Sequence, residues 1–232
     1  DNYRVNGTKI WTTDAHRNDY IICLVRTQPA EENRHAGLSQ IIIDLKRDGA
    51  KVRPIKNMAG GEDFNEVVFE DVVVPKDRIV GEAGNGWAQV TSELAYERSG
   101  PERFLSAFRV FVELVRFCGP EPTEYQATVI GRIASHIMTL RRMSISVAGM
   151  LESGKDVVVE AALVKELGNN FEKLLPELAR VVGSDGFSDF SRDGDLFRRT
   201  FEDTMLLSPS FTLRGGTREI LRGVIARGLG LR

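Results

Sequence analysis

The hydrophobic pattern of this chain changes its period once, and that change limits the fold more than any other feature. Up to about residue 80, compact runs of β-branched and aromatic residues alternate with polar, glycine-rich loops. After the stretch "GEAGNG", at 81–86, apolar residues recur about every 3.6 positions instead. A period of two is typical of strands and a period near 3.6 of amphipathic helices. We therefore predict an α+β chain with a small antiparallel β-domain at residues 1–83 and a helical domain at residues 84–232.

The predicted β-domain consists of short apolar segments between turn residues. Asn6-Gly7 interrupts the first segment and is a strong hairpin signal, because a type I′ turn needs positive φ at both central positions. We therefore expect a hairpin there, followed by strands at 20–27, 38–45 and 66–75. The chain begins at Asp1, almost inside the first strand, which would leave bare edges. We expect it to be a fragment, or a mature chain without its upstream part.

The helical half contains long amphipathic stretches with short connections. Apolar residues with helical spacing run through 87–115, 123–152, 157–182, 198–207 and 217–229. Long amphipathic helices in succession pack as bundles, because each must bury one apolar stripe. We predict an up-down four-helix-bundle-type C-terminal domain beside the β-domain.

Composition excludes several classes of protein. The formal net charge is −2 and the sequence pI is about 6.0, so no basic surface indicates nucleic-acid binding. No apolar run approaches the roughly 20 residues of a membrane span, and no signal-peptide pattern opens the chain. Cys23 and Cys118 match no metal or redox spacing, which favours a reduced, cytoplasmic setting. The three histidines are scattered, so we expect no metal site.

Three segments, in order along the chain, resemble one protein family. They are "VNGTKIWTTDAHRNDYIICLVRT" at 5–27, "GEAGNGW" at 81–87 and "GGTREILRGVIARGLGL" at 215–231. They resemble the β-domain, the entry into the C-terminal helical domain and the last helix of the acyl-CoA dehydrogenase family. The resemblance covers nearly the whole chain, and the family's N-terminal helical domain has no counterpart in it.

The resemblance implies an FAD-dependent oxidoreductase that acts on an acyl-CoA thioester. In the family, a carboxylate removes the α-proton while flavin N5 accepts a hydride from the β-carbon. The resemblance also implies a homo- or hetero-tetramer, in the cytoplasm and of bacterial origin, that passes electrons to an electron-transferring flavoprotein. Because the family's N-terminal domain forms part of the flavin pocket, we expect weak or no FAD binding by this chain alone.

The catalytic base is predicted at Glu97. Many members of the family carry the glutamate where this chain has Gly215, and glycine has no acid-base function. A second branch carries it on the first long helix of the C-terminal domain, just before an arginine, and Glu97-Arg98 match that pair. The resemblance gives Arg98 a contact with the CoA portion of the substrate. The alternatives are a surface acid at Glu97, paired with Arg98 or Arg103, and a surface salt bridge at Arg98.

A helix break is expected close to Glu97. Pro101 has no N–H, and in a continuous helix that N–H would pair with the carbonyl of Glu97. Gly100 weakens the helix further. We therefore predict a kink or an end of the helix at this point, which frees backbone groups beside the predicted base.

Two residues of the first strand match the family's Trp-x-Thr motif. Trp11 corresponds to the indole that packs on the flavin, and Thr13 to the hydroxyl that meets N5. Residues two apart on a strand share a face, so both side chains can address one ring. The alternative is a buried sheet aromatic and an ordinary strand-end threonine.

Two further segments match flavin-contacting motifs of the family. Thr217, Arg218 and Glu219 match Thr-x-(Gln/Glu) at the start of the last helix, where free backbone N–H groups suit an electron-rich partner. The alternative is ordinary capping by Thr217. "RVVGSDGF", at 180–187, lies where the family often has a segment that reaches the flavin of a neighbouring subunit. Gly183 agrees with that motif, whereas Arg180 replaces its glutamine.

The sequence leaves two functions open. One is an active acyl-CoA dehydrogenase with Glu97 as base. The other is a non-catalytic subunit or degenerate paralogue that pairs with an active partner, which Gly215 and the altered flavin segments favour. No feature favours a flavin monooxygenase or a nitroalkane-oxidising relative.

Overall fold

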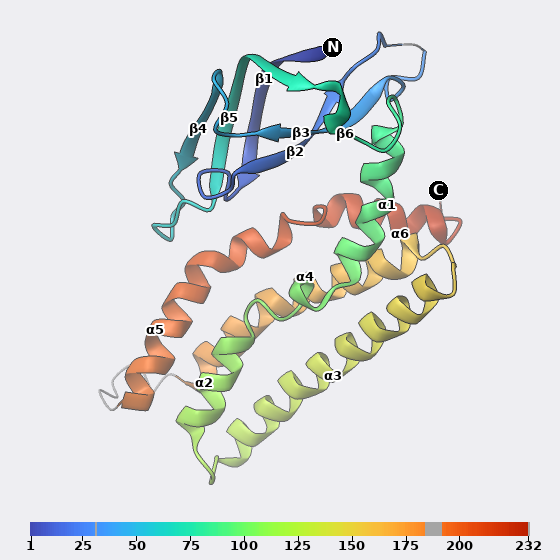
Figure 1. The fold of residues 1–232 in the computed structure, drawn as a ribbon. Helices are drawn as coiled ribbons and strands as arrows, with labels where there is room; N and C mark the ends of the chain where they lie inside the picture. Colours follow the sequence, from blue (N-terminus) through green and yellow to red (C-terminus); the bar gives the residue numbers. More distant parts are fainter. Residues whose placement is uncertain (31, 184–191, 232) are drawn as a thin grey trace. The chain divides into compact units, whose positions relative to one another are not determined.

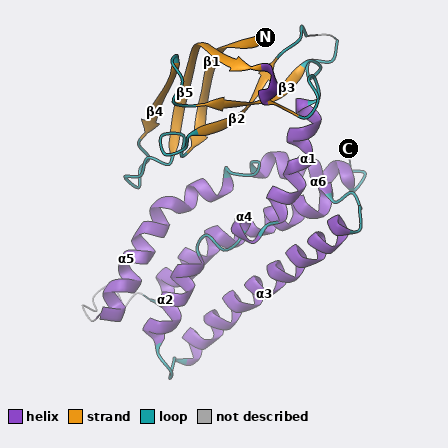
Figure 2. Ribbon diagram, in the orientation of Figure 1, coloured by secondary structure: helices purple, strands orange, loops and turns teal. Residues whose placement is uncertain are grey.

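The computed structural model describes residues 1–30, 32–183 and 192–231. The chain divides into two compact units, residues 1–92 and 93–232. Strands fill the first unit and helices the second, with helix α1 (Gly86–Ser99) running from one into the other (Figures 1 and 2). The predicted α+β class is therefore confirmed. In the described part of the chain, no helix is both long and apolar enough to cross a membrane.

The first unit contains two antiparallel sheets that share one core. One sheet has the order β1-β5-β4, with β1 at Asn2–Thr13, β5 at Phe64–Pro75 and β4 at Ala50–Ile55. The other has the order β2-β3-β6, with β2 at Tyr20–Arg26, β3 at Leu38–Asp44 and β6 at Ile79–Val80. Apolar side chains from both sheets bury one another, among them Val5, Cys23, Ile41, Ile43, Val67, Phe69, Val72 and Val74.

The hairpin predicted at Asn6-Gly7 is wrong. β1 continues through both residues and pairs with β5 along its whole length. Between the pairs Val5–Val72 and Gly7–Phe69 the register shifts by one residue, and Asp71 adopts a φ of 51°. The Asn6 side chain closes this β-bulge, since its Oδ1 accepts from the Asp71 N–H at 2.8 Å and its Nδ2 donates to Asp71 Oδ1 at 3.0 Å.

A second bulge reshapes the end of β1. The register shifts again between the pairs Lys9–Val67 and Thr12–Asn65, so that Ile10 and Trp11 lie opposite a single residue of β5. Trp11 has a φ of 63°, which is unusual for an aromatic residue. The simple alternation assumed for Trp11 and Thr13 is therefore interrupted, and the bulge sets the direction of the indole.

The second unit is a helix bundle of the predicted type. Helices α2 (Phe108–Cys118), α3 (Glu124–Glu152), α4 (Val158–Val182) and α5 (Arg192–Leu207) share one apolar core. Figure 1 shows α3 and α4 side by side and antiparallel, and α6 (Arg218–Gly228) also packs on α4. The core includes Phe104, Val110, Leu114, Ile133, Leu140, Val164, Phe171, Leu175, Phe197 and Phe201.

Short 3-10 turns connect several of these helices. One, η2 (Pro101–Arg103), follows α1, and another, η4 (Ser208–Thr212), leads from α5 towards α6. A capping box starts α3, because the Thr123 hydroxyl accepts from the Gln126 N–H while the Gln126 side chain accepts from the Thr123 N–H. These turns bring η2 and the segment before α6 onto the same stretch of α4.

Candidate functional site

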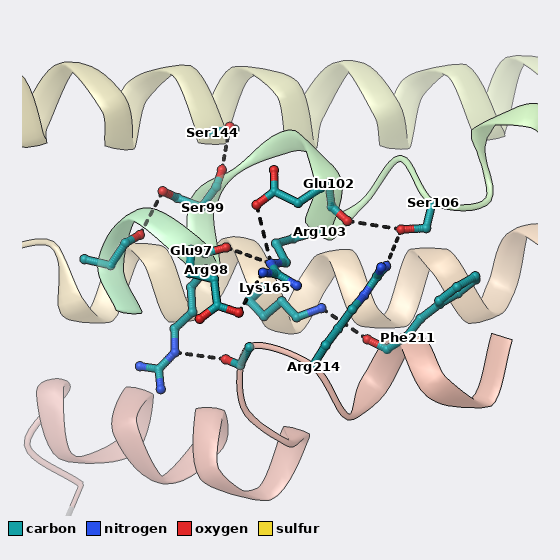
Figure 3. Close-up of polar contacts among 12 residues, drawn as sticks. Glu97, Arg98, Ser99, Glu102, Arg103, Ser106, Ser144, Lys165, Phe211 and Arg214 are labelled. Atoms are coloured by element: carbon teal, nitrogen blue, oxygen red, sulfur yellow. Dashed lines mark hydrogen bonds and ion pairs between the residues drawn. The ribbon is translucent and has the colours of Figure 1, made fainter. Parts of the chain in front are cut away.

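The predicted helix break beside Glu97 is confirmed. α1 ends at Ser99, and η2 begins at Pro101. The Glu97 carbonyl, which Pro101 leaves without a helical donor, accepts a hydrogen bond from Arg103 Nε at 2.7 Å (Figure 3). The Ser99 carbonyl accepts from the Ser144 hydroxyl of α3 at 2.6 Å. Side chains thus replace the backbone hydrogen bonds that the break removes.

Arg103 also binds the side chain of Glu97. Its Nη2 lies 2.7 Å from Glu97 Oε1, so one guanidinium contacts both the carbonyl and the carboxylate of the same residue (Figure 3). The Arg103 side chain is buried, whereas 41% of the Glu97 side chain is exposed. Of the two arginines considered as partners of Glu97 in the sequence, the hydrogen-bonded one is therefore Arg103.

Arg98 points to a different part of the bundle. Its side chain is buried and its Nε donates to the Gly215 carbonyl at 3.0 Å (Figure 3). A Cβ added at Gly216 would lie 3.5 Å from Arg98 Nη2. Arg98, the residue predicted to contact the substrate, thus packs against the Gly215-Gly216 pair that precedes α6.

Gly215 faces the same cation as Glu97. It has a φ of 68°, in the left-handed region that favours glycine. A Cβ at this position would lie 3.6 Å from Arg103 Cζ and 3.4 Å from Lys165 Cε. The two positions considered for the base are far apart in sequence, yet both lie beside Arg103.

Helix α4 carries a buried row of polar residues that packs against the segment before α6. Lys165, Asn169 and Glu172 are fully buried, and their spacing of four and three places them on one face of the helix. Lys165 Nζ donates to Asn169 Oδ1 at 2.6 Å and to the Phe211 carbonyl at 3.2 Å. Burial lowers the pKa of Lys165 to about 8, although Glu172 acts in the opposite direction. Sequence reasoning missed this row, whose polar residues at helical spacing inside an apolar stretch were the available signal.

Glu172 connects the row to two neighbouring segments. Its Oε1 accepts from the Ser106 backbone N–H at 3.0 Å and forms an ion pair with Arg214 Nη2 at 3.1 Å. Arg214 also donates to the Ser106 hydroxyl (Figure 3). The residue immediately before Gly215 is therefore held by a buried carboxylate of α4.

The start of α6 contains the predicted Thr217, Arg218 and Glu219. Thr217 occupies the N-cap position, but among the described residues its hydroxyl makes no capping bond to the helix backbone. The Arg218 guanidinium is paired with Glu166 of α4 at 3.0 Å. The pKa of the exposed Glu219 is lowered by its own backbone N–H and by the Thr217 hydroxyl. The side chain of Arg218 is thus engaged by a carboxylate of α4.

Gly183 is required for packing at the end of α4. It follows the helix as its C-cap residue, and a Cβ there would collide with the Phe197 ring of α5. This accounts for the glycine without a ligand. The rest of the predicted flavin-contacting segment, 184–187, lies outside the described residues.

In the first unit, Trp11 and Thr13 are both exposed. The indole is 62% exposed and meets Phe64 edge to face, with ring centroids 6.2 Å apart. The buried-aromatic alternative is therefore wrong for Trp11. An open aromatic face with a hydroxyl close by in the chain fits a flat, polar-edged ring such as isoalloxazine.

Comparison with known proteins gives consistent results along the chain. The family model "Acyl-CoA dehydrogenase, middle domain" matches residues 1–72, and "Acyl-CoA dehydrogenase, C-terminal domain" matches residues 84–230. Acyl-CoA dehydrogenase IpdE1 of Mycobacterium tuberculosis is 31% identical over 236 residues, covering 100% of this chain and 60% of that protein. Acyl-CoA dehydrogenase FadE29 of the same organism is 32% identical, covering 97% and 60%.

Solved structures agree with these matches. The ChsE4-ChsE5 complex from Mycobacterium tuberculosis superimposes with a TM-score of 0.80 at 27% identity, covering 100% of this chain and 62% of that one. The steroid ACAD Tcur3481-Tcur3483 superimposes with a TM-score of 0.84 at 23% identity, with the same coverage, and supports the fold. The chain spans about 60% of the length of these curated relatives. It belongs to the acyl-CoA dehydrogenase family, an oxidoreductase family whose members are FAD-dependent flavoproteins.

Proposed function

We propose that the protein is an FAD-dependent acyl-CoA dehydrogenase and that Glu97 removes the α-proton of an acyl-CoA thioester. The observation that carries the proposal is that Glu97 and Gly215 both lie beside Arg103. Arg103 Nη2 is 2.7 Å from Glu97 Oε1, and Arg103 Cζ would be 3.6 Å from a Cβ added at Gly215. A carboxylate at either position would lie beside the same guanidinium. FAD, when bound, would supply the acceptor for the hydride of the β-carbon.

The residues of the chain then divide the remaining work. The partly exposed carboxylate of Glu97 accepts the proton, and Arg98 holds the Gly215 carbonyl. By resemblance, the Arg98 guanidinium would also contact the CoA portion of the substrate. By resemblance, Trp11 and Thr13 would contact the flavin ring, and the main chain of Thr217, Arg218 and Glu219 would offer N–H groups to it. Gly183 belongs to the same cofactor-binding set by resemblance, beside its packing role.

Relatives suggest the partners. The ChsE4-ChsE5 neighbour is a complex of two proteins, and a relative that is 22% identical is named a subunit of a caffeyl-CoA reductase-Etf complex. We propose a homo- or hetero-oligomer, a tetramer by resemblance, that transfers electrons to an electron-transferring flavoprotein. Mycobacterial relatives support a bacterial enzyme. We propose a cytoplasmic setting from the cysteine pattern of the sequence.

Replacement of Glu97 tests the proposal. We expect Glu97→Gln, in the flavin-loaded enzyme, to lower kcat by about 1000-fold on any acyl-CoA thioester that the wild type oxidises with an artificial acceptor. The flavin absorbance spectrum should be unchanged. Glu93→Gln, one turn earlier on α1 and exposed, is the matched control and should retain wild-type turnover. Unchanged turnover of Glu97→Gln would exclude Glu97 as the base.

A non-catalytic subunit is the second candidate. It is favoured by the glycine at 215 and by the pairing of the Glu97 carboxylate with Arg103. In that case the wild-type protein would oxidise no thioester by itself, and Glu97→Gln would leave the turnover of its complex with an active partner unchanged.

A further inference from the structure

The break after α1 leaves the Glu97 carbonyl without a helical donor, and Arg103 binds this carbonyl. Pro101 removes the donor that the Glu97 carbonyl would have in a continuous helix, and Arg103 Nε supplies a replacement at 2.7 Å. The last turn of α1 therefore depends on a side chain for its shape. Without that hydrogen bond, the Glu97 carbonyl has no donor, although Ser144 and Gly215 still hold the two residues that follow it.

The same guanidinium also fixes the Glu97 side chain. Arg103 Nη2 binds the carboxylate at 2.7 Å, so the main chain and the side chain of one residue share one cation (Figure 3). The planar guanidinium presents its donors in a fixed geometry, whereas a lysine ammonium is a point charge on a flexible stem. The guanidinium of Arg103 thus binds both acceptors at once with its donors held in one plane.

Arg103 itself is held in place from two sides. Its side chain is buried, and its backbone carbonyl packs so closely on Gly168 of α4 that a larger residue there would collide with it. On the other side, the Gly215 backbone lies next to the guanidinium, so close that an added Cβ would be in contact with it. A rigid cation thus holds an acid whose carboxylate is still 41% exposed.

We propose that Arg103 is a positioning residue, which orients the carboxylate of Glu97 for proton removal by binding its backbone carbonyl and its side chain together. The inference rests on the proposed role of Glu97 as the base. Proton transfer from carbon needs close alignment, and a misplacement of about 1 Å costs about 100-fold in rate. The two contacts from Arg103 keep the exposed carboxylate pointing in one direction before substrate binds.

Arg103→Lys tests this inference, because it keeps the charge and removes the two-point contact. In the flavin-loaded enzyme we expect kcat to fall about 100-fold, while KM stays within about threefold of wild type. Arg116→Lys is the matched control: its Nη1 lies 2.9 Å from the buried Glu113 carboxylate, on α2, and its kcat should stay at the wild-type level.

Hydrogen exchange gives a second readout that does not need turnover. Amides of 93–99, in the last turns of α1, should exchange at least about tenfold faster in Arg103→Lys than in wild type, because Arg103 no longer ties the Glu97 carbonyl. Arg116→Lys should not change the exchange of this segment. A kcat of Arg103→Lys within about threefold of wild type, or equal losses in both variants, would overturn the inference.

Measuring Glu97→Gln beside these variants separates the two claims. If Glu97→Gln is inactive and Arg103→Lys has wild-type kcat, Glu97 remains the base and the positioning role is wrong. If Glu97→Gln retains turnover, the proposed base is wrong and the inference falls with it. If both lose kcat, the double variant should be no slower than Glu97→Gln, since the two residues act as one unit.

Discussion

Arg98 Nε donates a 3.0 Å hydrogen bond to the carbonyl of Gly215, so the residue next to the proposed base holds the loop before the last helix. The two residues are 117 positions apart, and the Arg98 side chain is buried. Hydrogen bonds from charged donors contribute about 1.5–3 kcal/mol. This contact therefore stabilises the bundle as well as placing Gly215 beside Arg103.

Arg98→Met should lower the free energy of unfolding by about 2 kcal/mol, because the Gly215 carbonyl loses its charged donor inside the protein. Urea denaturation measures the change. Arg180→Met is the control. Both side chains of the Arg180–Glu177 ion pair are exposed, so the pair should contribute less than about 0.5 kcal/mol to the free energy of unfolding. Equal stability of the two variants would show that the Arg98 contact contributes nothing.

Gly215→Ala should destabilise the protein by about 1–2 kcal/mol through its backbone alone. The φ of 68° disfavours any residue with a Cβ, while the space around that Cβ is adequate, with the nearest atom at 3.4 Å. Gly131→Ala is the matched control in α3, where the added Cβ meets open space and should stabilise the helix by about 0.5–1 kcal/mol. Thermal denaturation of both variants should give shifts of opposite sign.

The buried Lys165 predicts an increase in stability at alkaline pH. Its pKa is lowered by burial to about 8 in the folded protein, against 10.5 for the ordinary group. Between these values the unfolded chain binds the proton and the folded protein does not, so the free energy of unfolding rises with pH. The contribution is complete above the unfolded pKa and is lost as pH falls through about 8.

Lys165→Met should remove this pH dependence. Wild type should gain on the order of 2–3 kcal/mol relative to the variant between neutral pH and pH 10. Urea denaturation of both proteins across this range measures the difference. Parallel stability curves for the two proteins would show that the folded and unfolded states hold the Lys165 proton equally.

Helices were predictable because the signal for each is local. The change of period at 81–86 separates the two halves of the chain, and Pro101 with Gly100 predicted the end of α1. β4 was missed because only Ala50, Val52 and Ile55 are partly buried, and two charged residues and Pro54 lie between them. β6 has two residues, which is too short for a periodic pattern.

Contacts between distant segments could not be predicted from local sequence signals. Asn6-Gly7 suits a hairpin turn as well as a bulge, and the choice depends on Asp71, 65 residues later. The candidate site shows the same limit. A pairing of Glu97 with Arg103 was among the alternatives because both lie in one short segment, whereas the contacts of Arg103 and Lys165 with the Gly215 loop depend on the packing of α4 against α6.

The second bulge of β1 depends on Asn65, which fixes the strand beside Trp11. Asn65 is fully buried, and its Nδ2 donates to the Thr12 carbonyl at 3.0 Å. Asn65→Leu has similar volume but leaves that carbonyl without its donor, so we expect a loss of about 1–3 kcal/mol in unfolding free energy. Exchange at the amides of 10–13 should accelerate, because the bulge is no longer tied.

Asn18→Leu is the control: it removes an exposed amide that donates to the Asp14 carbonyl at 3.0 Å, and should cost at most about 1 kcal/mol without altering the exchange at 10–13. Wild-type exchange at 10–13 in Asn65→Leu would mean that pairing with β5 alone holds Trp11 at its positive φ.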